Sequence, residues 1–182
     1  MFTWLPELAA AAEHVAGRLG LHGLGPFELG ILSQREWADQ LTACLPMTPR
    51  VDLRHWGEHW YADQPVNEAL LDQLRAIADH GVPVGLLTNS VAEWEPHRAR
   101  VLAGQEIFSA TVKSHEIRLA KPDPAIFRYA DNLLPPPAGQ HALLIDDNRV
   151  NCAAAEHHGW LTIHHRSTPD TIAQLGRMRL PM

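Results

Sequence analysis

Residues 142–151 read ALLIDDNRVN, a short apolar run that ends in two adjacent carboxylates, Asp146 and Asp147. A run of this length followed by acids is typical of a buried parallel strand whose polar end faces a crevice. Two neighbouring aspartates repel each other unless water, a cation or a lysine compensates their charge. The stretch therefore indicates a metal or phosphate site, with an ordinary acidic turn after a strand as the alternative.

From Val66 onwards, helices and short apolar strands alternate along the chain. We expect strands at 82–87, 110–113, 142–147 and 161–164. This alternation predicts a Rossmann-like α/β fold, in which a parallel sheet is covered by helices on both faces. Ligands of such sheets bind at the carboxyl ends of the strands.

The first part of the chain has helical patterns throughout. Ser33 and Glu36 form a capping box ahead of apolar residues at helical spacing. We expect residues 1–65 to form a small helical cap segment, in which residues 2–5 are a candidate remnant strand. Residues 66–182 are expected to form the α/β core.

Composition narrows the class of protein and its partners. The chain has 182 residues, a net charge of −6 and 46% apolar side chains, as in ordinary soluble globular proteins. The negative charge disfavours nucleic acid and anionic membranes as partners. Cys44 and Cys152 lack metal-ligand spacing, so we expect reduced thiols in a cytoplasmic protein. The histidine doublets 157–158 and 164–165 are expected at the surface.

Polar side chains follow the expected strands where each strand ends. Thr88 and Asn89 close the strand that begins near residue 82, Lys121 precedes a helix, and Asp146 and Asp147 close a later strand. The carboxyl ends of parallel strands converge on one crevice. A hydroxyl and an amide donate hydrogen bonds to an anion, an ammonium neutralises it, and carboxylates hold Mg²⁺. The sequence therefore predicts a phosphate site.

Three ordered segments carry a resemblance to a known family. LLTNS (86–90), KPDPAIF (121–127) and LLIDDNRVNCAAAEHHGW (143–160) resemble the second, third and fourth motifs of the haloacid dehalogenase (HAD) superfamily of phosphohydrolases. The resemblance runs from about residue 66 to the end, and the preceding segment is similar to the family's small helical cap. It implies Mg²⁺-dependent hydrolysis of a small phosphorylated metabolite. Dehalogenation is less favoured, because relatives with that activity do not generally pair with an Asp-Asp fourth motif.

The resemblance also implies roles for single residues at the phosphate. Thr88 would donate a hydrogen bond to a phosphoryl oxygen, assisted by Asn89. Lys121 would neutralise the phosphate and the nucleophilic carboxylate. Thr88 and Lys121 are therefore the catalytic residues that the resemblance implies, and all three residues would bind phosphate.

The implied metal site lies in the fourth motif. Asp147 would be the Mg²⁺ ligand, and Asp146 its outer-sphere neighbour. Asn151 stands where many relatives place another acid, so it keeps an oxygen but lacks a charge, which weakens a cation site.

The family's first motif, a strand ending in Asp-x-Asp, is absent from this sequence. That motif supplies the covalent nucleophile and the general acid, and its strand lies centrally, between those bearing Thr88 and Asp147. The central strand is therefore expected to be missing or reduced. Three fillers are conceivable: the segment MFTWL (1–5), direct pairing of the two flanking strands, or residues upstream of an incorrectly assigned start, which we favour. An unpaired edge would also favour a homodimer.

Two functions from different classes follow. With an Asp-x-Asp strand supplied upstream, the protein is a Mg²⁺-dependent phosphatase that acts through an aspartyl-phosphate intermediate. As written, the chain lacks its attacking group, and the alternative is a pseudophosphatase that binds phosphate or another protein. Whether the chain is an enzyme therefore depends on the source of the nucleophile.

Overall fold

The computed structural model describes residues 5–62, 65–103 and 106–178. Contacts between residues divide the chain into two compact units. The first comprises Met1–Pro65, Asn89–Ala103 and Lys113–Ala120, and the second Val66–Thr88, Gly104–Val112 and Lys121–Met182. Of the candidate remnant strand at 2–5, residues 2–4 lie outside the described residues, and Leu5 begins a helix.

The described residues of the first unit form short helices. Those within residues 1–65 agree with the helical pattern of the sequence and are α1 (Leu5–Gly17), α2 (Gly25–Glu28), α3 (Gln34–Cys44), η1 (Leu53–His55) and α4 (Trp56–Tyr61). Three more helices of this unit come from the part of the chain that is expected in the α/β core, namely η2 (Ala92–Trp94), α6 (Glu95–Val101) and α7 (Ser114–Ile117). The capping box is confirmed, because Ser33 Oγ accepts from the backbone N–H of Glu36 while the Glu36 carboxylate accepts from the backbone N–H of Ser33.

Aromatic packing forms the core of this unit. Phe27 stacks on Trp37 with ring centroids 4.8 Å apart, and Trp56 meets Trp37 edge-on at 6.3 Å. Both tryptophans are buried, so their packing stabilises the helices of this unit. Trp60 is 45% exposed and stacks on Trp94.

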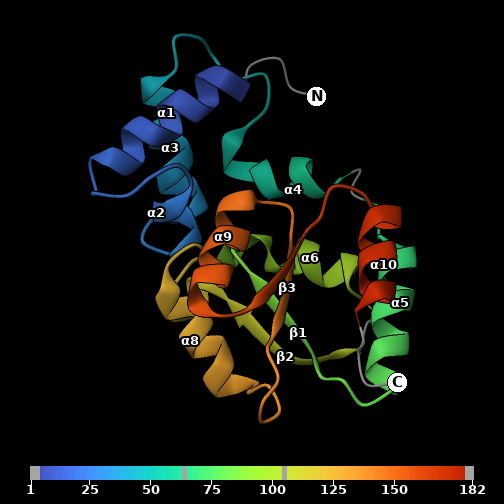
Figure 1. The fold of residues 1–182 in the computed structure, drawn as a ribbon. Coiled ribbons are helices and arrows are strands. Elements are labelled where there is room, and N and C mark those ends of the chain that lie inside the picture. The colour runs from blue at the N-terminus through green and yellow to red at the C-terminus, as the bar shows by residue number, and fades with distance from the viewer. Residues whose placement is uncertain (1–4, 63–64, 104–105, 179–182) are drawn as a thin grey trace. The chain divides into compact units, whose positions relative to one another are not determined.

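The second unit alternates strands and helices, which confirms the α/β fold. Its elements are α5 (Glu68–Asp79), β1 (Val84–Thr88), β2 (Phe108–Lys113), α8 (Pro124–Leu133), β3 (Leu143–Asp146), α9 (Arg149–His158), β4 (Leu161–His164) and α10 (Thr168–Arg177). Figure 1 shows α8 and α9 on one side of these strands, and α5 and α10 on the other. None of the helices in the described ranges is long and apolar enough to cross a membrane.

The strands form two separate sheets. β1 pairs with β2, and β3 pairs in parallel with β4, from Leu143 opposite Leu161 to Asp146 opposite His164. Direct pairing of β1 with β3, one of the three fillers considered for the missing central strand, is therefore wrong for the part of the chain that is described. Leu87 and Ile145 stay only half-buried, whereas interior strands of a parallel sheet are covered on both faces.

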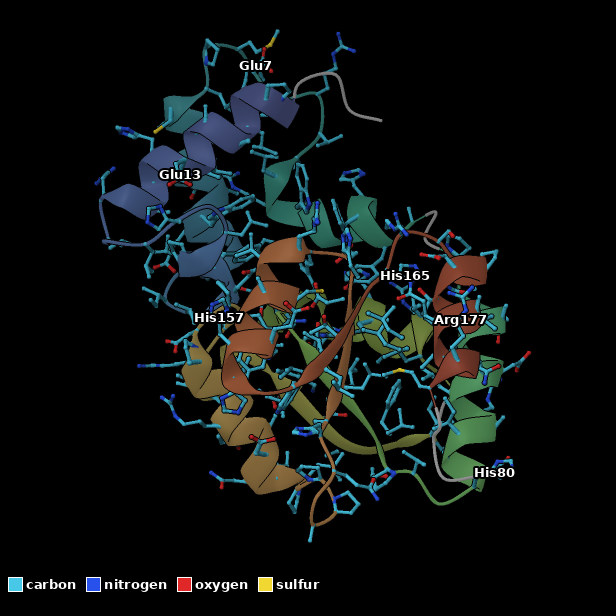
Figure 2. The ribbon with its side chains drawn as sticks, viewed as in Figure 1. Glu7, Glu13, His80, His157, His165 and Arg177 are labelled. Atoms are coloured by element: carbon cyan, nitrogen blue, oxygen red, sulfur yellow. The ribbon has the colours of Figure 1, made fainter. Side chains whose placement is uncertain are left out.

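The histidines of α9 differ in their surroundings. His157 is exposed and lies 2.7 Å from the Ala153 carbonyl of its own helix (Figure 2). The expectation of a surface position is wrong for His158, whose side chain is 15% exposed and lies 2.7 Å from Oδ2 of Asp131. Stacking on Phe127 covers the His158 ring.

Candidate active site

Lys121 links the carboxyl ends of the two sheets. Its Nζ donates to the carbonyl oxygen of Leu87 in β1 at 2.9 Å, and to Oδ2 of Asp146 in β3 at 2.6 Å. The side chains of Lys121 and Asp146 are only 9% and 5% exposed. The cis peptide bond that follows Lys121 leads into the Pro-initiated helix α8. The lysine therefore lies at the break between β1 and β3.

Three donors surround the carboxylate of Asp146. Besides Lys121 on Oδ2, its Oδ1 accepts from the backbone N–H of Asn148 at 2.8 Å and from Nδ2 of Asn151 at 3.1 Å. Charge-assisted hydrogen bonds of this kind stabilise a buried carboxylate. Burial and the nearby charge of Asp146 raise the pKa of the Cys152 thiol, which donates to the Asp146 carbonyl at 3.5 Å.

Asp147 lies in a different environment although it is the next residue. Its side chain is exposed and makes no hydrogen bond or ion pair with the described residues. Its carbonyl oxygen lies 3.0 Å from Nε2 of His164. Side chains alternate between the two faces along a strand, so β3 buries Leu144 and Asp146 and leaves Asp147 outside.

The described residues do not by themselves fit Mg²⁺. This ion takes near-octahedral oxygen ligands, usually one or two carboxylates with waters and substrate oxygens. Asp146 is engaged by three donors, and Asn151 presents its amide nitrogen rather than its oxygen to that carboxylate. Of these three residues, all within the described ranges, Asp147 is the one whose carboxylate has no hydrogen bond or ion pair. The roles predicted for Asp146, Asp147 and Asn151 at a metal stay predictions.

The predicted phosphate-binding residues divide between the two units. Thr88 is the last residue of β1, next to the Leu87 carbonyl that Lys121 binds. Asn89 belongs to the first unit, where its Nδ2 donates to Oε2 of Glu28 at 3.2 Å. The sequence had not pointed to Glu28, because 61 residues separate it from Asn89.

The first unit contains a second cluster of polar residues that the sequence does not predict. Ser114 Oγ accepts from the backbone N–H of Ser90 at 2.8 Å and donates to the carbonyl of Glu28 at 2.6 Å. Ser90 Oγ lies 2.9 Å from Nδ1 of His115. Burial lowers the pKa of the His115 imidazole, an effect that the nearby carboxylate of Glu116 opposes. No spacing rule links these residues, so no signal in the sequence reveals the cluster.

Comparison with known proteins agrees with the fold. A family model of haloacid dehalogenase-like hydrolases matches residues 10–159. A HAD family enzyme from Bacteroides thetaiotaomicron, solved as a magnesium complex, has a TM-score of 0.64 and 20% sequence identity, covering 94% of this chain and 90% of that chain. Its Asp12Ala mutant, in complex with magnesium and inorganic phosphate, has a TM-score of 0.60 and 20% identity, covering 87% and 83%.

A dehalogenase shares the same fold. The L-2-haloacid dehalogenase from Xanthobacter autotrophicus, with chloropropionic acid covalently bound, has a TM-score of 0.60 and 13% identity, covering 97% of this chain and 69% of that chain. No curated protein matches the chain. At these identities the structures show a shared fold, and with the family model they confirm the resemblance drawn from the three motifs.

Proposed function

Because the chain belongs to the haloacid dehalogenase-like hydrolases, we propose that it forms the phosphate-binding part of a phosphatase for a small phosphorylated metabolite. The attacking carboxylate is carried by a strand that lies between β1 and β3. The observation that carries this proposal is the division of the strands into two sheets at that place. Lys121 supports it, because its ammonium lies at the break and contacts both β1 and β3.

The residues of this chain would bind the phosphoryl group by donating hydrogen bonds and positive charge to its oxygens. Lys121 holds the attacking carboxylate and one phosphoryl oxygen by charge, and the Thr88 hydroxyl donates to another oxygen. The carboxylate forms a bond to phosphorus while the bond to the leaving oxygen breaks, and water then releases phosphate from the aspartyl phosphate. A second carboxylic acid on the added strand gives its proton to the leaving oxygen.

Magnesium belongs to the same proposal. The related Bacteroides enzyme was solved with magnesium and inorganic phosphate. In this chain Asp147 is the exposed carboxylate beside the strand end, so a bound Mg²⁺ would need further carboxylates from the added strand. When bound, the ion would neutralise phosphoryl charge.

The experiment adds the strand. An apolar segment ending in Asp-x-Asp is fused ahead of Met1 through a Gly-Ser linker, and hydrolysis of p-nitrophenyl phosphate is followed with Mg²⁺ and with EDTA. We expect turnover in the extended form with Mg²⁺ and none in the 182-residue chain. Asn in place of the first added Asp, or Lys121→Ala, abolishes turnover. Lys113→Ala, which removes a lysine paired with Glu95 and Glu116 in the first unit, leaves it in place.

Turnover that is equal with and without the added strand would contradict the proposal, as would a folded extended form that stays inactive. Circular dichroism and a cooperative melting curve establish that each form is folded. Phosphate release is measured on the same samples, so that loss of activity is separated from loss of fold.

A second candidate function, a phosphate-binding protein without hydrolysis, is favoured by one observation. The buried ammonium of Lys121 already has Asp146 as its counter-ion, so the chain does not need a nucleophilic carboxylate to balance that charge. In this case inorganic phosphate binds the 182-residue chain in a calorimetric titration, binding weakens in Thr88→Val, and no form hydrolyses the aryl phosphate. Turnover that disappears in Asp147→Asn would exclude this candidate.

A further inference from the structure

Asp146 is a buried carboxylate whose charge has to be balanced inside the protein. A carboxylate removed from water is stable as an anion only when paired and hydrogen-bonded. Its side chain is 5% exposed, and its three donors are an ammonium, a backbone N–H and a side-chain amide. A cation on this carboxylate would have to displace at least one of these donors.

The orientation of the Asn151 side-chain amide follows from the group that it faces. The residue is 8% exposed, and its Nδ2 lies 3.1 Å from Oδ1 of Asp146. An ionised carboxylate only accepts hydrogen bonds, so the group that faces it must be the amide NH₂ and not the amide oxygen. Asn151 therefore points a donor at the place where a metal ligand would have to point an oxygen.

The remaining carboxylate, Asp147, is exposed to water and has no partner among the described residues. A single solvated carboxylate is a weak site for a divalent cation, because protein Mg²⁺ sites rely on several fixed oxygens and Ca²⁺ sites on more. The charge of this strand end is thus balanced by a lysine and two hydrogen-bond donors of the chain itself.

We propose that Asn151 is a positioning residue that, together with Lys121, takes the place of a divalent cation beside Asp146. The chain as written folds with its acidic strand end balanced and has no affinity of its own for Mg²⁺ at millimolar concentration. One substitution, Asn151→Asp, removes the donor, places a second carboxylate against Asp146, and creates a cation site at this strand end. This inference concerns the 182-residue chain and does not rest on the proposed hydrolysis.

The test measures metal binding and stability, not activity. Mn²⁺ is titrated into each protein and free Mn²⁺ is followed by electron paramagnetic resonance, and melting temperatures are recorded with EDTA, Mg²⁺ and Mn²⁺. We expect the unsubstituted chain to bind no Mn²⁺ at this strand end. Its melting temperature should be the same with EDTA, with Mg²⁺ and with Mn²⁺. Asn151→Asp melts at a lower temperature in EDTA, regains its melting temperature with either metal, and binds Mn²⁺ with an affinity at least about tenfold above the weakest binding that the titration detects.

A matched control separates the effect of placing a carboxylate at position 151 from the effect of the added negative charge alone. Asn148→Asp adds the same charge three residues away, at an exposed position whose side-chain oxygen still caps Val150 N–H. We expect its melting temperature to be insensitive to Mg²⁺. An equal response in this control, or tight Mn²⁺ binding that Asp147→Asn removes from the otherwise unsubstituted chain, would overturn the proposal. If Asn151→Asp does not fold even with metal, the titration of the unsubstituted chain alone still decides it.

Discussion

The ammonium of Lys121 lies 2.6 Å from Oδ2 of Asp146, and the two side chains are 9% and 5% exposed. The pair joins residues 25 apart in the sequence, and Lys121 also holds the Leu87 carbonyl of the other sheet. Since removal of one partner from a buried ion pair leaves an uncompensated charge, we expect Lys121→Ala to lower the free energy of unfolding by about 3–5 kcal/mol.

Urea denaturation measures this loss, and the double substitution Lys121→Met with Asp146→Leu is its control. Replacing both charges by apolar side chains of similar volume leaves no unpaired charge, so the double variant should recover most of the stability. A Lys121→Ala protein within about 0.5 kcal/mol of the unsubstituted chain would show that the ion pair does not carry this stability.

Asp147→Asn should leave the stability of the chain nearly unchanged. The side chain is exposed and has no partner among the described residues, so a change within about 0.5 kcal/mol is expected. Asp146→Asn is the matched comparison, because it removes the charge that faces Lys121. Urea denaturation measures the free energy of unfolding of both variants. Equal losses of stability would contradict the assignment of Asp146, rather than Asp147, as the buried ion-pair partner of Lys121.

Trp37→Ala should be the most damaging of the tryptophan substitutions in the first unit. Trp37 is 2% exposed and stacks on Phe27, so truncation leaves a cavity and costs about 3–5 kcal/mol. Trp60→Ala, at a side chain 45% exposed, removes a stacking contact with Trp94 that contributes about 0.5–1.5 kcal/mol. Thermal unfolding of both variants tests the order, and a larger loss for Trp60→Ala would refute the placement of the core.

Stability should fall on acidification through His115. Burial lowers the pKa of its imidazole, with Glu116 opposing the shift and Lys113 and Arg98 adding to it. The folded state therefore resists protonation, whereas the unfolded chain takes up the proton near the ordinary pKa of about 6.5. Below that pH the unfolded state binds more protons, so the free energy of unfolding decreases as pH falls toward the folded pKa.

His115→Asn keeps a polar group near Ser90 and removes this titration. Unfolding free energies between about pH 5 and 8 should decrease less steeply toward acid in the variant than in the unsubstituted chain. Identical slopes would mean that His115 has the same proton affinity in both states.

Local signals explain what the sequence predicts well. The strand Leu161–His164 is found with the expected bounds, because an apolar run marks it. The helix Arg149–His158 before it is delimited by signals of the same local kind, a capping Asn148 and a terminal Gly159 at φ 100°. In the described part of the chain no strand lies between β1 and β3, which agrees with the expectation of a missing or reduced central strand that follows from the absent Asp-x-Asp motif. The break between β1 and β3 is its structural counterpart.

Long-range pairings explain what the sequence does not predict. The role of Asn89 at a phosphate stays a prediction, but its hydrogen bond to Glu28 could not be predicted, because no spacing rule connects the two residues. Likewise two adjacent aspartates look equivalent in sequence. Which of them is buried depends on the phase of β3, and this is set by the contacts of Leu144 and Asp146 in the folded unit.

Amide hydrogen exchange in β1 and β3 tests the central claim most directly, with the 182-residue chain compared to the form extended by an Asp-x-Asp strand. A strand that pairs with both edges takes up the backbone groups that neither β2 nor β4 binds. We expect those amides to exchange more slowly in the extended form, while the β3–β4 ladder is unchanged. The same exchange rates in β1 and β3 in both folded forms would contradict the claim that the attacking strand lies between them.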